Sequence, residues 1–456
     1  MRILLLVAAL TVATGAAAQP LPAEPPLLRE LPAQVSPERL RADIARMVSF
    51  GTRHTLSETR SDKRGIGAAR RWVAAEFASI GKDCGGCLTV ATPSAVVTAP
   101  PRVPTPTEIV DVLAIQRGTT DPDRVVIISG HLDSRVTDVM DFKSDAPGAN
   151  DDASGVAAVL EAARVLSKHR FAATIVYAAL SGEEQGLHGG KILADYAAQQ
   201  GWRVVANLNN DIVGNTEGVG GVRDNTHVRV FSEGTRAIET PEEANRRRYN
   251  GGEVDSPSRQ VARYLDGLAD RYLTNFDVVM VYRTDRFGRG GDQVRMLEAG
   301  YPAVRVTEAT ENYNRQHQDL RTEKEIRYGD TLDGVDFPYL AQVTRLNILG
   351  LAALAAAPAP PTGVDISGAV TADTTVKWTP APDAAAYRVW WRGTTDPTWR
   401  YSRVVPPTGE AKLTGVNIDD WFFGVSAVGR DGHESPVVFP GAPGRWAREA
   451  PAPAAR

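Results

Sequence analysis

Four short motifs of this chain bring acidic and histidine residues together. Three of the motifs directly follow runs of apolar residues, and the fourth lies in a glycine-flanked loop that leads into an expected helix. Their candidate residues, in chain order, are His131, Asp133, Asp151, Glu183, Glu184 and Asp211. Imidazoles and carboxylates are ligands of divalent metals, and adjacent carboxylates that leave a buried strand are costly without a nearby cation. Three strand-like runs that each end in such a residue therefore favour a metal site over coincidence.

Each motif taken alone also has a structural interpretation. A histidine at a strand end is usually a hydrogen-bonded surface residue, a glutamate pair is typical of a charged loop tip, and an aspartate before a helix is typical of an N-cap. A cap accounts for one member of the Asp151-Asp152 pair, which leaves the other available to bridge two cations. Asp133 lies two residues after His131 and is placed to receive the second ring N–H of that histidine.

Short β-branched runs alternate with amphipathic helical patterns between residues 36 and 356. This alternation predicts an α/β fold with a mixed, mostly parallel sheet flanked by helices. We expect the first helix to begin after Ser36 and the last to run over residues 338–356. Open α/β sheets bind ligands beyond the carboxyl ends of their strands, and the strand-end motifs are expected to lie in such a crevice.

Residues 357–440 have a different composition, in which apolar and polar residues alternate between Pro, Gly and Asp turns. The pattern predicts a small β-sandwich. A resemblance to a fibronectin type III domain is carried by Trp378, Tyr387, Val389, Val425 and Ala427. Trp421 stands where that family usually has a tyrosine. We expect residues 441–456 to form a flexible tail, and the pattern does not indicate a partner for this domain.

The first residues include Arg2, a short apolar run and three alanines at residues 16–18. This pattern is typical of a cleaved secretory signal over residues 1–18. We therefore expect a secreted or periplasmic protein, and the alternative is an uncleaved anchor. Residues 19–35 are rich in Pro and Ala and predict a flexible lead-in. We identify no other segment long and apolar enough to span a bilayer, so stable membrane insertion is not expected.

Composition and cysteine content narrow the class of protein. Lys and Arg number 51 against 55 Asp and Glu, and the net charge of -4 does not favour a nucleic-acid partner. With 43% hydrophobic and 23% charged residues, the chain is close to the globular average. An oxidising compartment favours a structural disulfide between Cys84 and Cys87, with a redox or metal role as the alternative.

The motifs H-x-D, N-D-D-x-S-G, G-E-E-x-G-L-x-G and N-D occur in the same order in the secreted co-catalytic di-zinc aminopeptidases, and the chain resembles this family over roughly residues 36–355. Bacterial leucyl aminopeptidase is a member. The resemblance implies two zinc ions bridged by Asp151. It implies His131 and Asp211 as further ligands of one ion, and Glu184 and a distal histidine as further ligands of the other. It also implies Glu183 as the general base and Asp133 as the carboxylate behind His131. It also implies a cis peptide bond after Asp151.

The resemblance places the distal ligand at His317, which lies in a polar loop after a strand-like run over residues 301–308. The H-T-x-x-D pattern of the family is replaced here by His317-Gln318-Asp319. The histidines that lie outside all of these motifs are expected at the surface, and they are His54, His169, His227 and His433.

A second departure from the family lies at residues 286–293. Gly291-Asp292-Gln293 stands where members commonly have S-D-H, and this stretch contains no tyrosine to hold the oxyanion. Arg289 is our candidate for the positive donor in its place, and a structural ion pair is the alternative interpretation of this arginine.

The residues and the resemblance together predict a secreted zinc metallopeptidase, specifically an aminopeptidase that acts on peptides or oligopeptides. Two zinc ions about 3.5–4 Å apart can hold one hydroxide and polarise the scissile carbonyl, while Glu183 takes its proton and passes it to the leaving amine. The alternatives are a carboxypeptidase on the same scaffold, a glutaminyl cyclase-like transferase with one zinc, and a non-catalytic peptidase-like binding ectodomain. Five ligand candidates argue for two metals, and the presence of Glu183 argues against an inactive relative.

Overall fold

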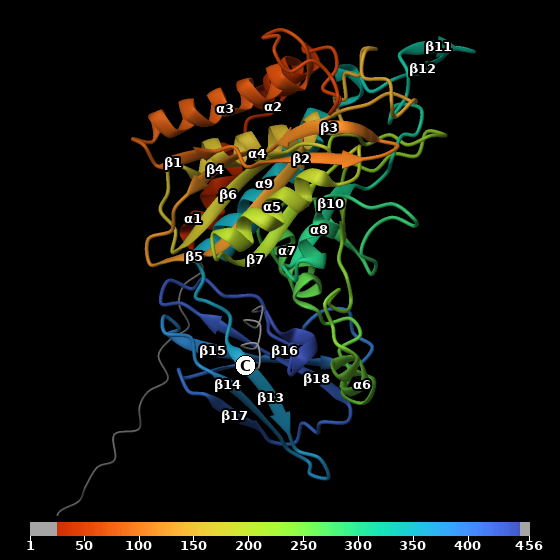
Figure 1. Ribbon diagram of the computed structural model, residues 1–456. Coiled ribbons are helices and arrows are strands. Elements are labelled where there is room, and N and C mark those ends of the chain that lie inside the picture. The colour runs from red at the N-terminus through yellow and green to blue at the C-terminus, as the bar shows by residue number, and fades with distance from the viewer. Residues whose placement is uncertain (1–24, 447–456) are drawn as a thin grey trace, which may run out of the picture.

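A mixed sheet forms the centre of the larger part of the chain (Figure 1). Its strands are β1 (Leu88–Ala91), β4 (Val112–Gln116), β5 (Asp121–His131), β6 (Ala173–Leu180), β7 (Arg203–Asn210), β8 (His227–Phe231), β9 (Asp277–Val281) and β10 (Ala303–Glu308). Within residues 25–446, which the computed structural model describes, these eight strands are ordered β1-β4-β6-β5-β7-β10-β8-β9. Strands β6, β5, β7 and β10 run parallel to one another, and β9 runs parallel to β8. The expected mixed, mostly parallel sheet is confirmed.

Helices cover both faces of this sheet. One face carries α2 (Pro37–Val48), α3 (Gly65–Asp83), α4 (Ala153–Leu166), α7 (Pro257–Tyr272) and α9 (Phe337–Ala356), and the other carries α5 (His188–Gln199) and α8 (Gln293–Glu298). Successive side chains of β5 alternate between the two cores: Val126 and Ile128 pack on the side of α4 and α9, whereas Val125 and Ile127 pack on the side of α5 and α8. This is the two-residue period of a strand that is buried on both faces.

Local sequence signals account for the ends of several helices. The side chain of Ser36 accepts a hydrogen bond from the backbone N–H of Arg39 and caps α2, as expected from Ser36 followed by proline. Asp336 caps α9 in the same way, so that helix begins at Phe337, one residue before the expected start. Cys84 and Cys87 form a disulfide that joins the end of α3 to the chain just before β1.

The flexible lead-in expected over residues 19–35 is wrong for its described part. α1 (Pro26–Glu30) and the 3-10 helix η1 (Leu31–Gln34) lie against α9, and Leu28 and Leu31 are buried in the core. Proline is tolerated in the first turn of a helix, so a Pro-rich composition does not exclude one. The apolar spacing of Leu28, Leu31 and Val35 provides the buried face. Residues 1–24, which include the expected signal peptide, lie outside the described residues.

Helix α9 corrects the expectation that no segment after the leader could span a bilayer. By length and composition it could, with a mean hydropathy of 1.3 over its most apolar window. However, 83% of that window is buried inside the protein, because α9 packs against α4 and the sheet. The apolar surface of α9 is therefore accounted for by the core.

Antiparallel strands form the C-terminal body, drawn in blue below the larger part in Figure 1. One sheet has the order β13-β14-β17 and the other β16-β15-β18. The strands are β13 (Thr362–Ser367), β14 (Thr374–Thr379), β15 (Ala386–Gly393), β16 (Tyr401–Val405), β17 (Glu410–Leu413) and β18 (Trp421–Val428). Trp378, Tyr387 and Phe423 share one core between the two sheets. A small β-sandwich is present as expected, and its resemblance to fibronectin type III stays a prediction.

The expected flexible tail is wrong for residues 441–446. A short 3-10 helix, η3 (Ala442–Gly444), follows the last strand, and Pro443 and Gly444 are buried. Trp446 packs against both the main core and the C-terminal core. Residues 447–456 lie outside the described residues.

Buried polar contacts join the two bodies. The guanidinium of Arg392 on β15 donates to both carboxylate oxygens of Asp255, each at 2.9 Å, and Arg263 of α7 donates to the same carboxylate at 2.8 Å. Trp399 also donates its indole N–H to Gln260 of α7 at 2.9 Å. The remaining elements are the hairpins β2 (Ser94–Ala99) with β3 (Val103–Val110) and β11 (Arg321–Glu323) with β12 (Ile326–Tyr328), the helix α6 (Pro241–Asn250) and the 3-10 helix η2 (Leu332–Gly334).

We expect Leu31→Ala to lower the free energy of unfolding by about 2–5 kcal/mol, because it opens a cavity under α9. Leu320→Ala is the matched control, since Leu320 is 45% exposed, and it should cost less than about 1 kcal/mol. Denaturant unfolding of both variants measures the difference. Equal small losses would show that the N-terminal helices contribute little to the core.

Candidate metal centre

The carboxyl ends of three neighbouring parallel strands meet at one edge of the sheet. β5 lies between β6 and β7, with parallel register on both sides. His131 is the last residue of β5, Glu183 and Glu184 lie in the loop after β6, and Asp211 follows β7 directly. The parallel register is the reason that motifs far apart in the sequence come together here.

Two groups of metal-capable side chains form at this edge within residues 25–446. The first group is His131, Asp151 and Asp211, and the second is Asp151, Glu184 and His317. Within each group the candidate ligand atoms all lie within 4.8 Å of one another. The structure therefore brings together all five residues expected to be metal ligands, including the distal His317.

Asp151 belongs to both groups and turns one carboxylate oxygen to each. Its Oδ1 lies 3.0 Å from Nε2 of His131, and its Oδ2 lies 2.9 Å from Nε2 of His317. In the first group Oδ1 of Asp211 is 3.8 Å from the same Nε2 of His131, and in the second Oε1 of Glu184 is 3.0 Å from Nε2 of His317. The peptide bond between Asp151 and Asp152 is cis, as the resemblance implied.

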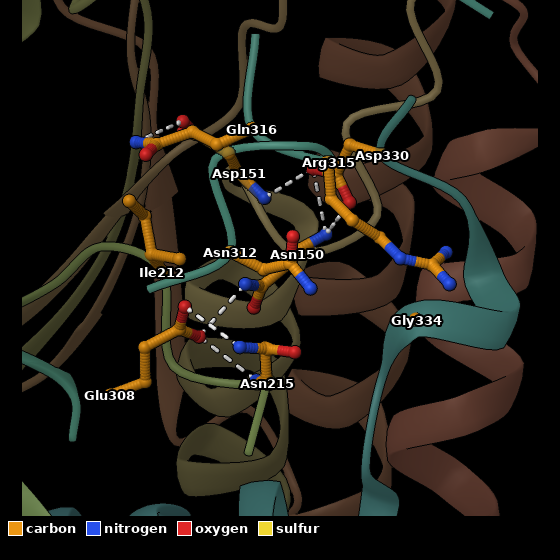
Figure 2. Close-up of a pocket in the computed structure, with 10 residues that line it drawn as sticks. All are labelled: Asn150, Asp151, Ile212, Asn215, Glu308, Asn312, Arg315, Gln316, Asp330 and Gly334. Carbon is orange, nitrogen blue, oxygen red and sulfur yellow. Dashed lines mark hydrogen bonds between the residues drawn. The ribbon is translucent and has the colours of Figure 1, made fainter. Parts of the chain in front are cut away.

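The loop that carries Asp151 is held by buried carboxylates on its other side (Figure 2). Asp330 accepts hydrogen bonds from the backbone N–H groups of Asn150, at 2.8 Å, and Asp151, at 2.7 Å. Glu308, at the end of β10, accepts from the side chain of Asn150 at 2.8 Å and from the backbone N–H of Asn215 at 2.9 Å. Gln316 donates to Oδ2 of Asp151 at 3.2 Å. These contacts leave the carboxylate of Asp151 little freedom to turn.

Asp152 has the structural role that the N-cap interpretation predicted for one member of the pair. Its carboxylate accepts from the backbone N–H of Gly155 and caps α4. It also accepts from the backbone N–H of His131 at 2.9 Å and of Ile212 at 3.2 Å. One side chain thus ties the ends of β5 and β7 to the start of α4.

Asp133 contacts His131 as expected, but mainly through its backbone. Nδ1 of His131 lies 3.1 Å from the carbonyl oxygen of Asp133 and 3.6 Å from its carboxylate. The carboxylate instead accepts from Thr55 Oγ1 at 2.8 Å and from the backbone N–H groups of Gly182, at 3.0 Å, and Glu184, at 3.1 Å. Asp133 therefore orients the loop of the two glutamates as well as the histidine.

Glu183, the expected general base, is partly buried beside the first group. Burial raises its pKa well above the usual value, Glu184, Asp211 and Asp292 raise it further, and His131 opposes them. A carboxylate with a raised pKa is suited to accept and return a proton near neutral pH.

Arg305 is a buried partner of the metal site that the motifs did not indicate. It lies on β10, beside β7, and its guanidinium donates to Oδ2 of Asp211. The side chain of Arg305 is fully buried, and a second carboxylate, Asp285, lies 3.7 Å away. Although burial alone would raise the pKa of Asp211, Arg305 and His131 hold it well below its usual range.

Arg135 was also missed, although it directly follows the H-x-D-S sequence. Its Nε donates to Oε2 of Glu184 at 2.8 Å, and its Nη2 lies 2.6 Å from Nδ1 of His317. Burial lowers the pKa of His317, but Glu184 and Asp151 raise it to about 10. Because a guanidinium only donates hydrogen bonds, the contact with Arg135 fits a ring whose Nδ1 accepts and carries no proton.

Arg289, our candidate for an oxyanion donor, contacts a different residue. Its Nη1 lies 3.3 Å from Oε2 of Glu311, which also pairs with Arg229 at 2.8 Å and with Arg286 at 3.5 Å. The side chain of Arg289 is 38% exposed. The contacts thus match the structural ion pair rather than a catalytic donor. A lone arginine in a loop carries no signal of which carboxylate it will meet.

Two histidines expected at the surface are buried. His54 accepts from the backbone N–H of Leu56 at 3.0 Å, and its Nε2 lies 2.9 Å from the carbonyl oxygen of Val139. His433 is also buried, in the C-terminal body. The ring of His54 is satisfied by backbone groups of Leu56 and Val139, and the second of these lies far along the chain, which a local pattern does not show.

The donor set fits divalent metal ions. Imidazole nitrogens and carboxylate oxygens converge in both groups, and Oε1 of Glu184 is buried without accepting a hydrogen bond. Burial lowers the pKa of His131, yet Asp152, Asp133 and Asp151 raise it well above its usual value. Without metal the ring therefore carries a proton at neutral pH that a metal would displace.

Comparison with known proteins agrees with this donor set. Residues 111–333 match the family described as peptidase family M28. A probable zinc metalloprotease of Leptosphaeria maculans is 45% identical over 410 residues, which cover 89% of this chain and 95% of that protein. A probable zinc metalloprotease of Pyrenophora tritici-repentis is 44% identical, over 91% of this chain and 86% of the relative.

Solved structures share the fold at low sequence identity. The LapA aminopeptidase of Legionella pneumophila aligns with a TM-score of 0.53 and 17% identity, over 76% of this chain and 77% of that one. A leucine aminopeptidase precursor from Bacteroides thetaiotaomicron aligns with a TM-score of 0.50 and 16% identity, over 70% and 97%. Identity of 45% over 95% of a curated relative, together with the matched region and the paired ligand groups, places this chain in peptidase family M28, as a zinc metalloprotease.

Proposed function

We propose that this protease is an aminopeptidase that holds two zinc ions and removes N-terminal residues from peptides. The observation that carries the two-metal proposal is the division of Asp151, whose two oxygens lie near two different histidines. A single-metal site, as in a glutaminyl cyclase-like enzyme, would not need two complete groups of donors. His131 and Asp211 would hold one ion, and Glu184 and His317 the other.

Zinc, when bound, supplies a Lewis acid for the scissile carbonyl and lowers the pKa of water. The protein contributes the position of each ligand and the proton acceptor. Glu183 interacts electrostatically with His131 and Asp211 of the first group and with Glu184 of the second, and its raised pKa lets it take a proton and return it to the leaving amine. Asp133 holds the backbone next to Glu183 through Gly182 and Glu184, so the base keeps a defined place.

The charges around the site favour a free amino terminus over a free carboxylate as the recognised end. Buried carboxylates of Asp292 and Asp330 lie close to those of the proposed ligands. Arg135 and Arg305 are both paired with ligand carboxylates, which leaves neither to bind a C-terminal carboxylate. Structural neighbours described as aminopeptidases are consistent with this choice.

The same proposal covers the location of the protein and the type of its C-terminal domain. Residues 1–18 have the pattern of a secretory signal, and the disulfide of Cys84 and Cys87 suits an oxidising compartment. We therefore propose a secreted or periplasmic enzyme whose C-terminal sandwich is fibronectin type III-like. No partner is assigned to that sandwich.

A panel of short peptides tests the direction of cleavage. We expect hydrolysis of peptides with a free amino terminus, whether or not their carboxyl terminus is amidated, and no hydrolysis when the amino terminus is acetylated. Chelation should abolish activity and added zinc should restore it. Cleavage of acetylated peptides that occurs only when their carboxyl terminus is free would instead identify a carboxypeptidase.

Glu183→Gln tests the proposed base. We expect kcat to fall by about 10²–10⁴-fold, because the variant cannot accept the proton, while zinc content stays that of the unmodified protein. Glu298→Gln on α8 is the control, since this glutamate is 52% exposed and pairs only with Arg295 within the described residues. Normal turnover of the Glu183 variant at full zinc content would remove this residue from the mechanism.

Zinc affinity should rise with pH. The raised pKa of His131 means that the metal-free site holds a proton which zinc displaces. The affinity should therefore increase about tenfold per pH unit for each displaced proton, until the pH exceeds the raised pKa. Calorimetry in buffers of different ionisation enthalpy measures the released protons. His227→Gln is the control, because the side chain of His227 is 42% exposed and pairs with Asp224, and this variant should show the same dependence of zinc affinity on pH. A zinc affinity that does not change with pH would contradict the assignment of His131 as a ligand.

A further inference from the structure

Each terminal carboxylate ligand divides its two oxygens between a histidine and an arginine. Glu184 turns Oε1 to Nε2 of His317, at 3.0 Å, and Oε2 to Nε of Arg135, at 2.8 Å. Asp211 turns Oδ1 towards Nε2 of His131, at 3.8 Å, and Oδ2 to Nη1 of Arg305. The same division thus occurs in both groups, although the two arginines come from different parts of the chain.

The two arginines belong to different elements, and both are held within the site. Arg305 extends from β10, where its neighbour across the parallel pair is Asn209, two residues before Asp211. Arg135 extends from the loop after β5 and is also held by the carbonyl of Val136, at 3.1 Å. Side-chain exposure is 0% for Arg305 and 16% for Arg135. Neither guanidinium is a mobile surface charge, so each contact restricts its carboxylate.

The ligand set carries three buried carboxylates, and an unpaired buried charge is costly. Asp151 lies between His131 and His317, whereas Glu184 and Asp211 each have an arginine as an additional cation. A guanidinium that binds one carboxylate oxygen uses a lone pair of that oxygen and fixes the carboxylate plane, which favours coordination of a metal through the other oxygen. Catalytic metal sites keep a coordination position open for water or substrate, and a carboxylate limited to one oxygen preserves that position.

We propose that Arg135 and Arg305 are positioning residues that limit Glu184 and Asp211 to one metal-facing oxygen each and keep both carboxylates in place before metal binds. The inference rests on the metal site proposed above and assigns these arginines no contact with substrate. It applies to both groups, and its effect on folding is larger for Arg305, which is the more deeply buried of the two.

Cobalt(II) in place of zinc tests the coordination directly, because its visible absorption depends on coordination number and geometry. In Arg305→Gln and Arg135→Gln the released carboxylate can bind through both oxygens, so we expect a weaker visible band at unchanged cobalt content. Arg124→Gln is the control matched to Arg305 in burial. Arg124 is 3% exposed and also pairs with a carboxylate, Asp121 at 3.0 Å, but it lies near the opposite end of β5 and donates to carbonyls of Leu354 and Ala357. Its spectrum should equal that of the unmodified protein.

Thermal unfolding with and without zinc provides a second readout. Without metal, loss of Arg305 leaves Asp211 with only the more distant His131, at 3.8 Å, as a cation, and Tm should fall by roughly 3–8 °C. With zinc bound, the carboxylate still has a cation, so the fall should be less than half as large. Arg135→Gln should show the same asymmetry with smaller losses, and Arg124→Gln should lose the same amount in both states.

The outcomes separate this inference from the proposed function. Unchanged cobalt spectra in both variants, or equal losses of Tm with and without zinc, would show that the arginines act only as general scaffold and would overturn the inference. An unmodified protein that binds no cobalt would overturn the proposed metal site instead. Should Arg305→Gln fail to fold, the partly exposed Arg135→Gln decides the question by the same spectrum.

Discussion

The division of one carboxylate between two histidines is the constraint on which the rest of the structure depends. Asp151 can serve both groups only while its plane is fixed, because a small rotation would take one oxygen from its histidine. The protein fixes it mainly through the backbone, and Gln316 adds one contact to the side chain. Asp330 holds the N–H groups of Asn150 and Asp151, and Asp152 joins the ends of β5 and β7 behind them.

This arrangement concentrates negative charge in the interior, and the surrounding residues compensate for it. Burial raises the pKa of Asp330 to about 7 and that of Asp292 to about 7. Arg305 and Arg135 provide fixed positive charges at the proposed terminal ligands, Asp211 and Glu184. Arg53, fully buried, donates instead to the carbonyls of Leu132, Pro147 and Gly148 and fastens the loop of Asp151 to the end of β5. Arg135 and Arg305 therefore compensate for the buried negative charge, whereas Arg53 holds the loop of Asp151 in place.

Much of the fold and of the ligand set could be predicted from local patterns. Helix α2 begins directly after Ser36 as expected, and α9 begins one residue before its expected start. His131 and Asp211 end or follow strands, so their place depends on the strand period and on parallel pairing, both of which leave a signal in the sequence. The N-terminal helices were missed because composition hid the spacing of Leu28 and Leu31. The two paired arginines were missed because a charged residue does not reveal its partner.

The sequence by itself determined which residue types stand at the strand ends, the order of the motifs and the alternation that builds the sheet, since these depend on neighbours along the chain. Only the tertiary structure decided how each side chain is oriented. In the folded protein the carboxylate of Asp133 accepts a hydrogen bond from the backbone of Glu184. Arg289 pairs with Glu311, and Arg305 of β10 pairs with Asp211. The physical reason is that a buried charge takes the nearest compensating partner in space, and that partner is fixed by the packing of strands and loops rather than by distance along the chain.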